Sequence, residues 1–368
     1  MTVGKNRSAA ARRIGLCVLG LAALLAGVAP PANAGSNERL GTGGAPELLI
    51  PVGPRGFALG SSVASDISGV EATFWNPAGL ATVERPEALF THNQYFADMK
   101  VNFAAVAVKA GNLGVLGFSA KVLSVGDLIV TTEQAPEGTG QSVNPTYAVL
   151  GLSWARAFTD RVNFGLTAAY DNEHIIDMTA TGVAFDFGVQ YTTGWRGLKL
   201  GMAIKNIGTS MAFDGSGLEV SVLPPGSEPS ASNRIVQFTT AKFEMPSYFN
   251  LAARMDVTRS ASSALLVLGS FQSNNFSGDN LNVGAEWSHR DLIILRGSWF
   301  GTYSNNTDPT TGSTSSSFGS GDDLYEGVAL GAEVAAHAGS TKMGVAFGWR
   351  PVRSPFDDIY EIGLRFSF

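Results

Sequence analysis

The chain alternates apolar residues with polar or small residues along much of its length. A period of two residues is typical of β-strands that have one face in an apolar environment. In the clearest segments, aliphatic and aromatic side chains share one face, and Gly, Ala or polar side chains share the other. These segments are residues 162–170, 183–191, 198–205, 249–256, 281–288 and 343–350. The pattern predicts an all-β protein.

Counting such segments predicts about fourteen strands, near 87–97, 99–110, 113–124, 146–158, 161–173, 180–193, 196–206, 246–257, 263–273, 280–289, 291–301, 324–337, 341–350 and 358–368. The short turns, such as 111–112 and 338–340, all fall at one end of an up-and-down meander. The long loops 125–145, 207–245 and 302–323 fall at the other end. This sorting is typical of periplasmic turns and extracellular loops, and an even strand count places both ends of the barrel on the periplasmic side. A soluble β-sandwich also alternates, but it has no reason to sort its loops in this way.

Two further features favour a membrane barrel over a sandwich. Aromatic residues stand at the ends of the apolar faces, as in the girdles of membrane barrels: Tyr170, Tyr191, Trp287, Trp299, Trp349 and Phe368. The last segment alternates cleanly and ends the chain on an aromatic residue. We expect Tyr360, Phe366 and Phe368 to form a signal for the barrel-assembly machinery, although a soluble edge strand can end on phenylalanine by chance.

Residues 48–85 are irregular and too apolar for a tail in water. They include Phe74–Leu80, in which Asn76-Pro77 predicts a turn, because proline fixes φ and the asparagine side chain can hydrogen-bond to its own backbone. The stretch is either a tight turn leading into the first strand or part of a plug inside the barrel. Fourteen strands enclose more space than eight, which side chains fill, and less than the water channel of sixteen, so a plug segment would close the lumen. The candidate plug residues are Asp66, Phe74, Trp75, Asn76, Pro77 and Gly79.

Charged residues of both signs fall on the strand face opposite the apolar one, which in a membrane barrel is the lumen. They either form structural ion pairs across the interior or provide a polar conduit and a docking surface for the plug. The candidates are Lys121, Asp186, Lys205, Arg254, Glu286, Arg296, Glu333, Arg350, Glu361 and Arg365.

The first 34 residues read as a secretory signal, with four basic residues, an apolar run from Ile14 to Val28 and Ala32-Asn33-Ala34 before the expected cleavage site. An uncleaved anchor and twin-arginine export are the alternatives. We therefore expect a signal peptide at 1–34, an N-terminal plug segment at 35–85 and an outer-membrane barrel at 86–368, in a diderm bacterium.

Charge and cysteine content narrow the possible partners. Four of the 25 Lys and Arg residues lie in the signal, which leaves 21 against 31 acidic residues and a net charge of −10. An acidic chain lacks the basic footprint that nucleic acid requires. The single cysteine, Cys17, lies in the signal, so the mature chain is expected to have no disulfide and no cysteine-ligated metal.

No catalytic constellation is recognisable, so we predict no enzyme, no cofactor and no metal. The histidines His92, His174, His289 and His337 have no metal-ligand spacing. Nothing resembles a nucleophile elbow. The acidic stretch 321–323 is either a calcium loop or, more simply, a solvated one.

The segment Gly53–Gly60 followed by Phe74–Ala81 resembles the N-terminal region of the PorV/PorQ family, which is similar in fold to the FadL long-chain fatty-acid transporters. Residues 182–186, 196–202 with Asn206-Ile207-Gly208, and 282–286 also resemble strands of that family. The resemblance covers about 48–368. It departs at 47–52, which matches loosely, and at the loop 302–323.

Three functions follow from these observations. The resemblance implies association with protein secretion of the type IX kind, with exported cargo or secretion-system subunits bound at the loops. The alternative is a FadL-like transporter of a hydrophobic small molecule, which needs an apolar pocket open sideways or through a movable Asn76-Pro77 turn. The third is a structural barrel whose only partner is the outer-membrane lipid. An outer-membrane phospholipase is a remoter fourth.

Overall fold

The computed structural model describes residue 39 and residues 42–223, 225–226, 232–307, 314–318, 325–352 and 355–368. The predicted signal, residues 1–34, and the acidic stretch 321–323 lie outside the described residues. No helix in the described part of the chain is both long enough and apolar enough to cross a membrane.

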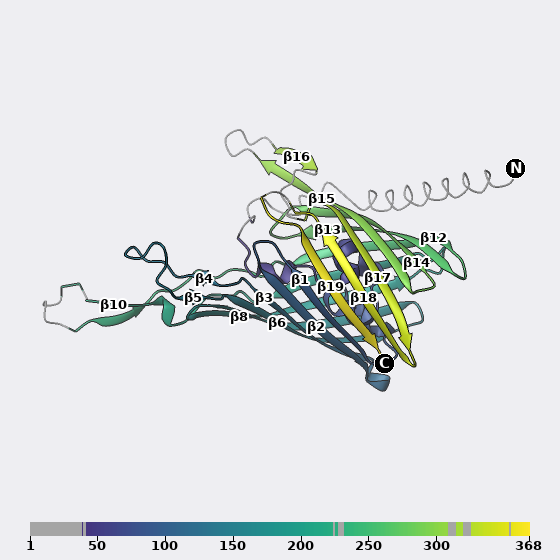
Figure 1. Cartoon of the computed structure of the whole chain (residues 1–368), viewed down its shortest axis with the longest axis horizontal. Helices are drawn as coiled ribbons and strands as arrows, with labels where there is room; N and C mark the ends of the chain where they lie inside the picture. Colours follow the sequence, from purple (N-terminus) through teal and green to yellow (C-terminus); the bar gives the residue numbers. More distant parts are fainter. Residues whose placement is uncertain are drawn as a thin grey trace.

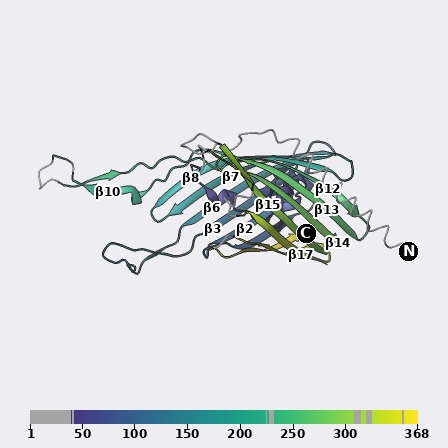
Figure 2. The same ribbon diagram turned by 90° about the horizontal axis from the view of Figure 1, so that it is seen from above.

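The described strands form one closed antiparallel barrel of fourteen strands (Figures 1 and 2). Each wall strand pairs with the next along the chain, and β1 pairs with β19 to close the ring. The wall strands are β1 (Glu87–Gln94), β2 (Lys100–Lys109), β3 (Val115–Ser124), β6 (Thr146–Ala157), β7 (Val162–Ile175), β8 (Met178–Thr192), β9 (Lys199–Gly208), β12 (Tyr248–Arg259), β13 (Ser263–Asn274), β14 (Asp279–His289), β15 (Ile293–Thr307), β17 (Gly327–Ala338), β18 (Thr341–Arg350) and β19 (Ile359–Ser367).

The predicted fold class is confirmed, and every predicted strand overlaps a wall strand. Sequence patterning missed the small sheets that extend the loops away from the barrel (Figure 1). They are β4 (Leu128–Ile129) paired with β5 (Ser142–Val143), β10 (Glu219–Val222) paired with β11 (Arg234–Gln237), and β16 (Thr314–Phe318) paired with the end of β15. These strands have two to five residues, too few for a period of two to stand out.

The outer face of the wall is apolar and exposed. Leu152 and Val345, for example, are 63% and 55% exposed, and the outward residues of β19 are Tyr360, Ile362 and Leu364. A continuous band of such side chains is unstable in water and stable in lipid, so the barrel is built to span a membrane. Phe366 and Phe368, expected to act in assembly, extend this outward face at the end of the chain.

The plug segment passes through the lumen. It starts at the end that bears the long loops, where Gly43 pairs with Glu244 and lies against Phe276. It finishes at the other end, where the Glu87 carboxylate accepts a hydrogen bond from Val70 N–H at 2.9 Å and β1 begins. The segment therefore fills the barrel from one mouth to the other, as the purple ribbon inside the wall shows (Figure 1).

The plug segment folds as short helical turns because proline and glycine punctuate it. Proline stands at the start of three turns, where its fixed φ suits a first helical position. Gly53 and Gly60 flank one turn with φ of 91° and 63°, a conformation that residues with a Cβ rarely adopt. The turns are η2 (Pro46–Leu49), α2 (Pro54–Leu59), η3 (Gly60–Ser65), η4 (Gly69–Glu71), α3 (Ala72–Trp75) and η5 (Pro77–Thr82).

The plug segment supplies the apolar core of the barrel interior. Phe57, Leu59 and Leu80 are fully buried. Several inward-facing wall residues are glycines, because the plug backbone approaches too closely for a side chain: a Cβ at Gly165 would lie 2.2 Å from the Pro77 carbonyl carbon, and one at Gly201 would lie 2.2 Å from the Ala64 carbonyl oxygen. The abundance of glycine thus reflects contact between plug and wall.

We expect Gly165→Ala to destabilise the protein, because the added methyl group forces the plug backbone away from β7. Overpacking of this kind costs about 1–3 kcal/mol. Gly297→Ala is the matched control, since its Cβ would lie 3.4 Å from Leu330, an ordinary contact. Urea unfolding of both variants in detergent measures the difference, and equal free energies of unfolding would contradict the close contact.

Candidate functional site

The turn at Asn76 joins three parts of the interior. Asn76 is fully buried, and its side-chain oxygen accepts a hydrogen bond from Ala78 N–H at 3.1 Å, which caps η5. Its amide nitrogen lies 2.8 Å from the Ala64 carbonyl oxygen, 3.3 Å from that of Val189 on β8 and 3.4 Å from that of Met202 on β9. One amide therefore ties the turn to the plug and to two wall strands.

The neighbouring aromatic residues have different roles. Trp75 Nε1 donates a hydrogen bond to the Val52 carbonyl oxygen at 2.8 Å and so joins two stretches of the plug segment. Pro77 starts η5 and packs against β7 and β8, and a Cβ at Gly79 would lie 2.1 Å from the Ile67 carbonyl oxygen. Phe74 instead points toward the wall.

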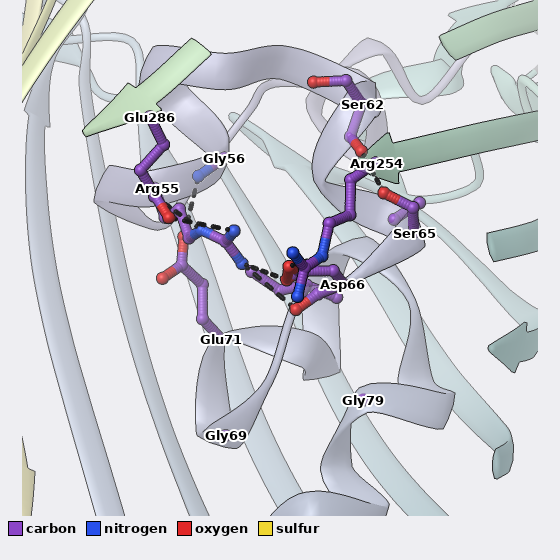
Figure 3. A network of polar contacts seen from close by, with 12 residues as sticks. Arg55, Gly56, Ser62, Ser65, Asp66, Gly69, Glu71, Gly79, Arg254 and Glu286 are labelled. Atoms are coloured by element: carbon purple, nitrogen blue, oxygen red, sulfur yellow. Dashed lines mark hydrogen bonds and ion pairs between the residues drawn. The ribbon is translucent and has the colours of Figure 1, made fainter. Parts of the chain in front are cut away.

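A chain of buried charges links the plug segment to β12, β14, β15 and β17. Figure 3 shows its part around Arg55, with Asp66, Arg254 and Glu286. Arg55 lies at its centre, 2.9 Å from Glu286 and 3.0 Å from Asp66. Asp66 also pairs with Arg254 at 2.7 Å. Beyond Glu286, Arg296 continues the chain at 2.7 Å and reaches Glu333 at 2.6 Å. We call these six residues, Arg55, Asp66, Arg254, Glu286, Arg296 and Glu333, the ion network.

Charge alternates along the ion network, so each buried group has a partner of opposite sign. Burial opposes the charge of Arg55, but Asp66 and Glu286 raise its pKa above the usual value of an arginine. Arg55 and Asp66 come from the plug segment, whereas the other four come from the wall. Arg55 and Asp66 pair with each other and also with Glu286 and Arg254, so two ion pairs join the plug segment to the wall.

Further polar contacts hold the plug against the remaining wall. Glu71 accepts a hydrogen bond from Gly56 N–H and pairs with Arg365. Arg350 donates to the Phe57 carbonyl oxygen at 2.9 Å, and Glu361 accepts from Gly53 N–H at 3.2 Å. All ten wall residues that the polar face singled out thus face the interior, and seven of them contact the plug segment directly, namely Lys121, Lys205, Arg254, Glu286, Arg350, Glu361 and Arg365.

A small cavity lies beside Phe74, against strands β2 to β9. Its volume is about 40 Å³, and its lining includes Leu48, Phe103 and Val149. Lys121 and Lys205 approach the Phe74 ring to 4.6 and 4.4 Å from the centroid. Lys205 also donates to the Phe74 carbonyl oxygen and pairs with Asp186 at 3.3 Å. The cavity therefore has a mixed lining: besides the apolar side chains and the two ammonium groups, it includes Thr73, Ser119, Thr167, Asp186 and Asn206.

Sequence patterning missed one group of acidic residues. The carboxylates of Glu47, Asp171 and Glu173 meet next to the cavity. Burial, together with the charges of Asp171 and Glu173, raises the pKa of Glu47 to about 9. Asp171 and Glu173 stand two apart on β7 and so share its inward face, a signal visible in the sequence. Nothing in the sequence pairs either of them with Glu47.

We expect Arg55→Met to lower the free energy of unfolding by about 3 kcal/mol, because it leaves buried carboxylates with one partner fewer. The variant should also raise the ion conductance of the barrel in planar bilayers, because the plug is held less firmly. The control is Arg259→Met, which removes an exposed pair with Asp256 and should cost less than about 1 kcal/mol. Equal losses of unfolding free energy in the two variants would contradict the conclusion that Arg55 holds the plug segment to the wall.

The fold is similar to that of solved channels for hydrophobic compounds. The monoaromatic hydrocarbon channel CymD aligns with 11% identity over 87% of this chain and 98% of its own, with a TM-score of 0.52. The toluene transporter TodX of P. putida aligns with 10% identity over 86% of this chain and 98% of its own, with a TM-score of 0.51.

No protein-family model matches the chain, and no curated protein matches it significantly, so the resemblance to PorV/PorQ stays a prediction. At the identities above, similarity extends to the fold alone. A barrel with an N-terminal segment in its lumen, which the FadL-like resemblance implied, is confirmed, and the chain shares its fold with these hydrocarbon channels.

Proposed function

We propose that this protein is an outer-membrane channel for a hydrophobic small molecule. The cavity between Phe74 and the wall carries the proposal, because Leu48, Phe103 and Val149 give it an apolar part inside a barrel whose opposite side is held by paired charges. The fold shared with a hydrocarbon channel and a toluene transporter supports this function over a purely structural barrel.

In the state described, the cavity is too small to hold such a molecule. About 40 Å³ is far less than the roughly 150 Å³ of an apolar cavity that holds benzene. Transport therefore requires movement of the plug at Phe74. The wall there is thin: Gly151 and Ala169 line the cavity and also a groove on the outer face beside Phe118 and Tyr170. A sideways route from the cavity to this groove would require the ladder between β6 and β7 to open, because Gly151 pairs with Ala169 there.

Uptake measurements test the proposed function. Cells that lack other hydrophobic channels and produce this protein should accumulate radiolabelled toluene or a long-chain fatty acid faster than cells with an empty vector. Lactose, a polar solute, should enter both at the same rate. Equal uptake of both apolar probes with and without correctly assembled protein would overturn the proposal.

A disulfide at the cavity should block uptake. The pair Thr73→Cys and Gly117→Cys joins α3 to β3, because a Cβ at Gly117 would lie 3.0 Å from Thr73 Cγ2. The only native cysteine, Cys17, lies in the predicted signal, so no other thiol competes. Oxidised cells should take up the probe at the background rate, and a reductant should restore it.

The matched control is a disulfide on the opposite side of the lumen. Ser61→Cys and Ser270→Cys joins η3 to β13, where the two native hydroxyl oxygens are 2.8 Å apart. The plug is held there beside the ion network, so oxidation should leave uptake unchanged. Inhibition by this control, or none by the cavity disulfide, would show that the moving part is not at Phe74.

Association with secreted proteins is a second proposal. The hairpin of β10 and β11 extends far from the barrel (Figure 1), and Ile235 and Phe238 on it are 71% and 62% exposed. Exposed apolar side chains on a protruding loop are typical of protein-binding sites. Replacing Ile235 and Phe238 by serine should abolish recovery of secreted proteins or secretion-system subunits with the purified barrel, and unchanged recovery would contradict this role.

A further inference from the structure

Three carboxylates from distant parts of the sequence meet inside the barrel. Glu47 lies on η2 of the plug segment, and Asp171 and Glu173 lie on the inward face of β7. One oxygen atom from each lies within 4.8 Å of the others. The residues are 1%, 0% and 5% exposed, so water contributes little to stabilising their charges.

Most oxygen atoms of these carboxylates have no hydrogen-bond partner among the described residues. Both oxygens of Glu47, both of Asp171 and Oε1 of Glu173 are buried without a hydrogen bond. None of the three residues takes part in an ion pair within the described part of the chain. Unpaired buried carboxylates cost several kcal/mol each, so they require either protons or a bound cation.

The cation that lies beside this group is committed elsewhere. Lys121 Nζ donates to the Glu47 carbonyl oxygen at 2.6 Å and lies 3.4 Å from that of Ile50. Its hydrogen bonds therefore fix the backbone of the plug segment, and its charge acts on Glu47 and Asp171 without forming an ion pair with either. The result is a site whose free atoms are all carboxyl oxygens, which contrasts with the alternating charges of the ion network.

We propose that Glu47, Asp171 and Glu173 bind a calcium ion. Calcium takes carboxylate oxygens at 2.3–2.6 Å, so oxygens that share one ion are separated by up to about 5 Å. Magnesium keeps several of its waters and dehydrates reluctantly, which suits a buried site poorly. Zinc and copper prefer nitrogen and sulfur ligands, whereas these three side chains offer oxygen alone.

The position of the site gives the ion a structural effect. Asp171 and Glu173 lie at the end of β7 near the long loops, which we expect to face the external medium. A bound ion joins η2 to this strand. The next residue in η2, Leu48, lines the cavity beside Phe74. Calcium thus holds the plug closed on the side where the proposed channel would open.

Calorimetric titration of calcium chloride into the full-length protein in detergent tests the site directly. The native protein should bind one ion with a dissociation constant of about 10⁻⁴–10⁻³ M, the range of extracellular calcium sites. Glu47→Gln, Asp171→Asn and Glu173→Gln keep the shape of each side chain and should each weaken binding at least tenfold, by about 1.4 kcal/mol. Glu133→Gln, an exposed residue of the loop 125–145, is the control and should bind as the native protein does.

Thermal unfolding separates calcium from protons as the compensating charge. Calcium should raise the melting temperature of the native protein and of Glu133→Gln above that in EDTA, and the three site variants should lose this shift. No saturable binding to native protein, or unchanged binding by the assembled variants, would overturn the proposal. A second outcome would also overturn it: amide variants that are more stable than the native protein, together with a native protein whose stability calcium does not alter. Protons, not calcium, would then neutralise the three carboxylates. Because no transport is measured, the result is independent of the proposed channel function.

Discussion

The rest of the structure depends on how charge is neutralised in a lumen that holds little water. A barrel of this width presents many inward side chains, and here several of them are ionised groups. Arg55 and Asp66 of the plug segment pair with Glu286 and Arg254 of the wall, which also have charged partners within the wall. Breaking one partner of such a buried pair is far more costly than losing a surface pair. The plug and the wall are therefore one folding unit, not a pore with a separate stopper.

The two sides of the lumen differ in how firmly they hold the plug. Toward β12 and β14, the ion pairs Arg55–Glu286 and Asp66–Arg254 would have to separate for the plug to move. Toward β2 to β9, the plug is held by the Asn76 amide and by lysines that donate to backbone carbonyl groups. A lysine that loses a neutral carbonyl group leaves no second charge unpaired. Movement at Phe74 is consequently the less costly way to open the interior.

The sequence predicted the position and the inward face of each strand, but it did not predict contacts between residues that are far apart in the chain. A period of two residues identified the wall strands and their inward faces, because both are local properties. Asn76-Pro77 indicated one turn of the plug segment for the same reason, whereas its other helical turns were not predicted. The partner of Arg55 is Glu286, 231 positions away, and only the closed barrel brings them together. Glu47 was missed because its contact with Asp171 and Glu173 of β7 forms only in the folded barrel, and no sequence pattern near any of the three indicates it.

The unpaired carboxylates and the cavity lie on the same side of the lumen, and this has a physical consequence. Ion pairs within the protein hold the plug at any calcium concentration. A site that needs a bound cation stabilises the plug only to the extent that the site is occupied, and occupancy depends on the calcium concentration of the medium. Glu47 and Leu48 are adjacent in η2, so the backbone that the ion fixes is also the backbone that lines the cavity. The ion network would then keep the plug in the barrel while calcium sets how readily its other side moves. Permanent attachment and adjustable opening are thus assigned to opposite walls of one barrel.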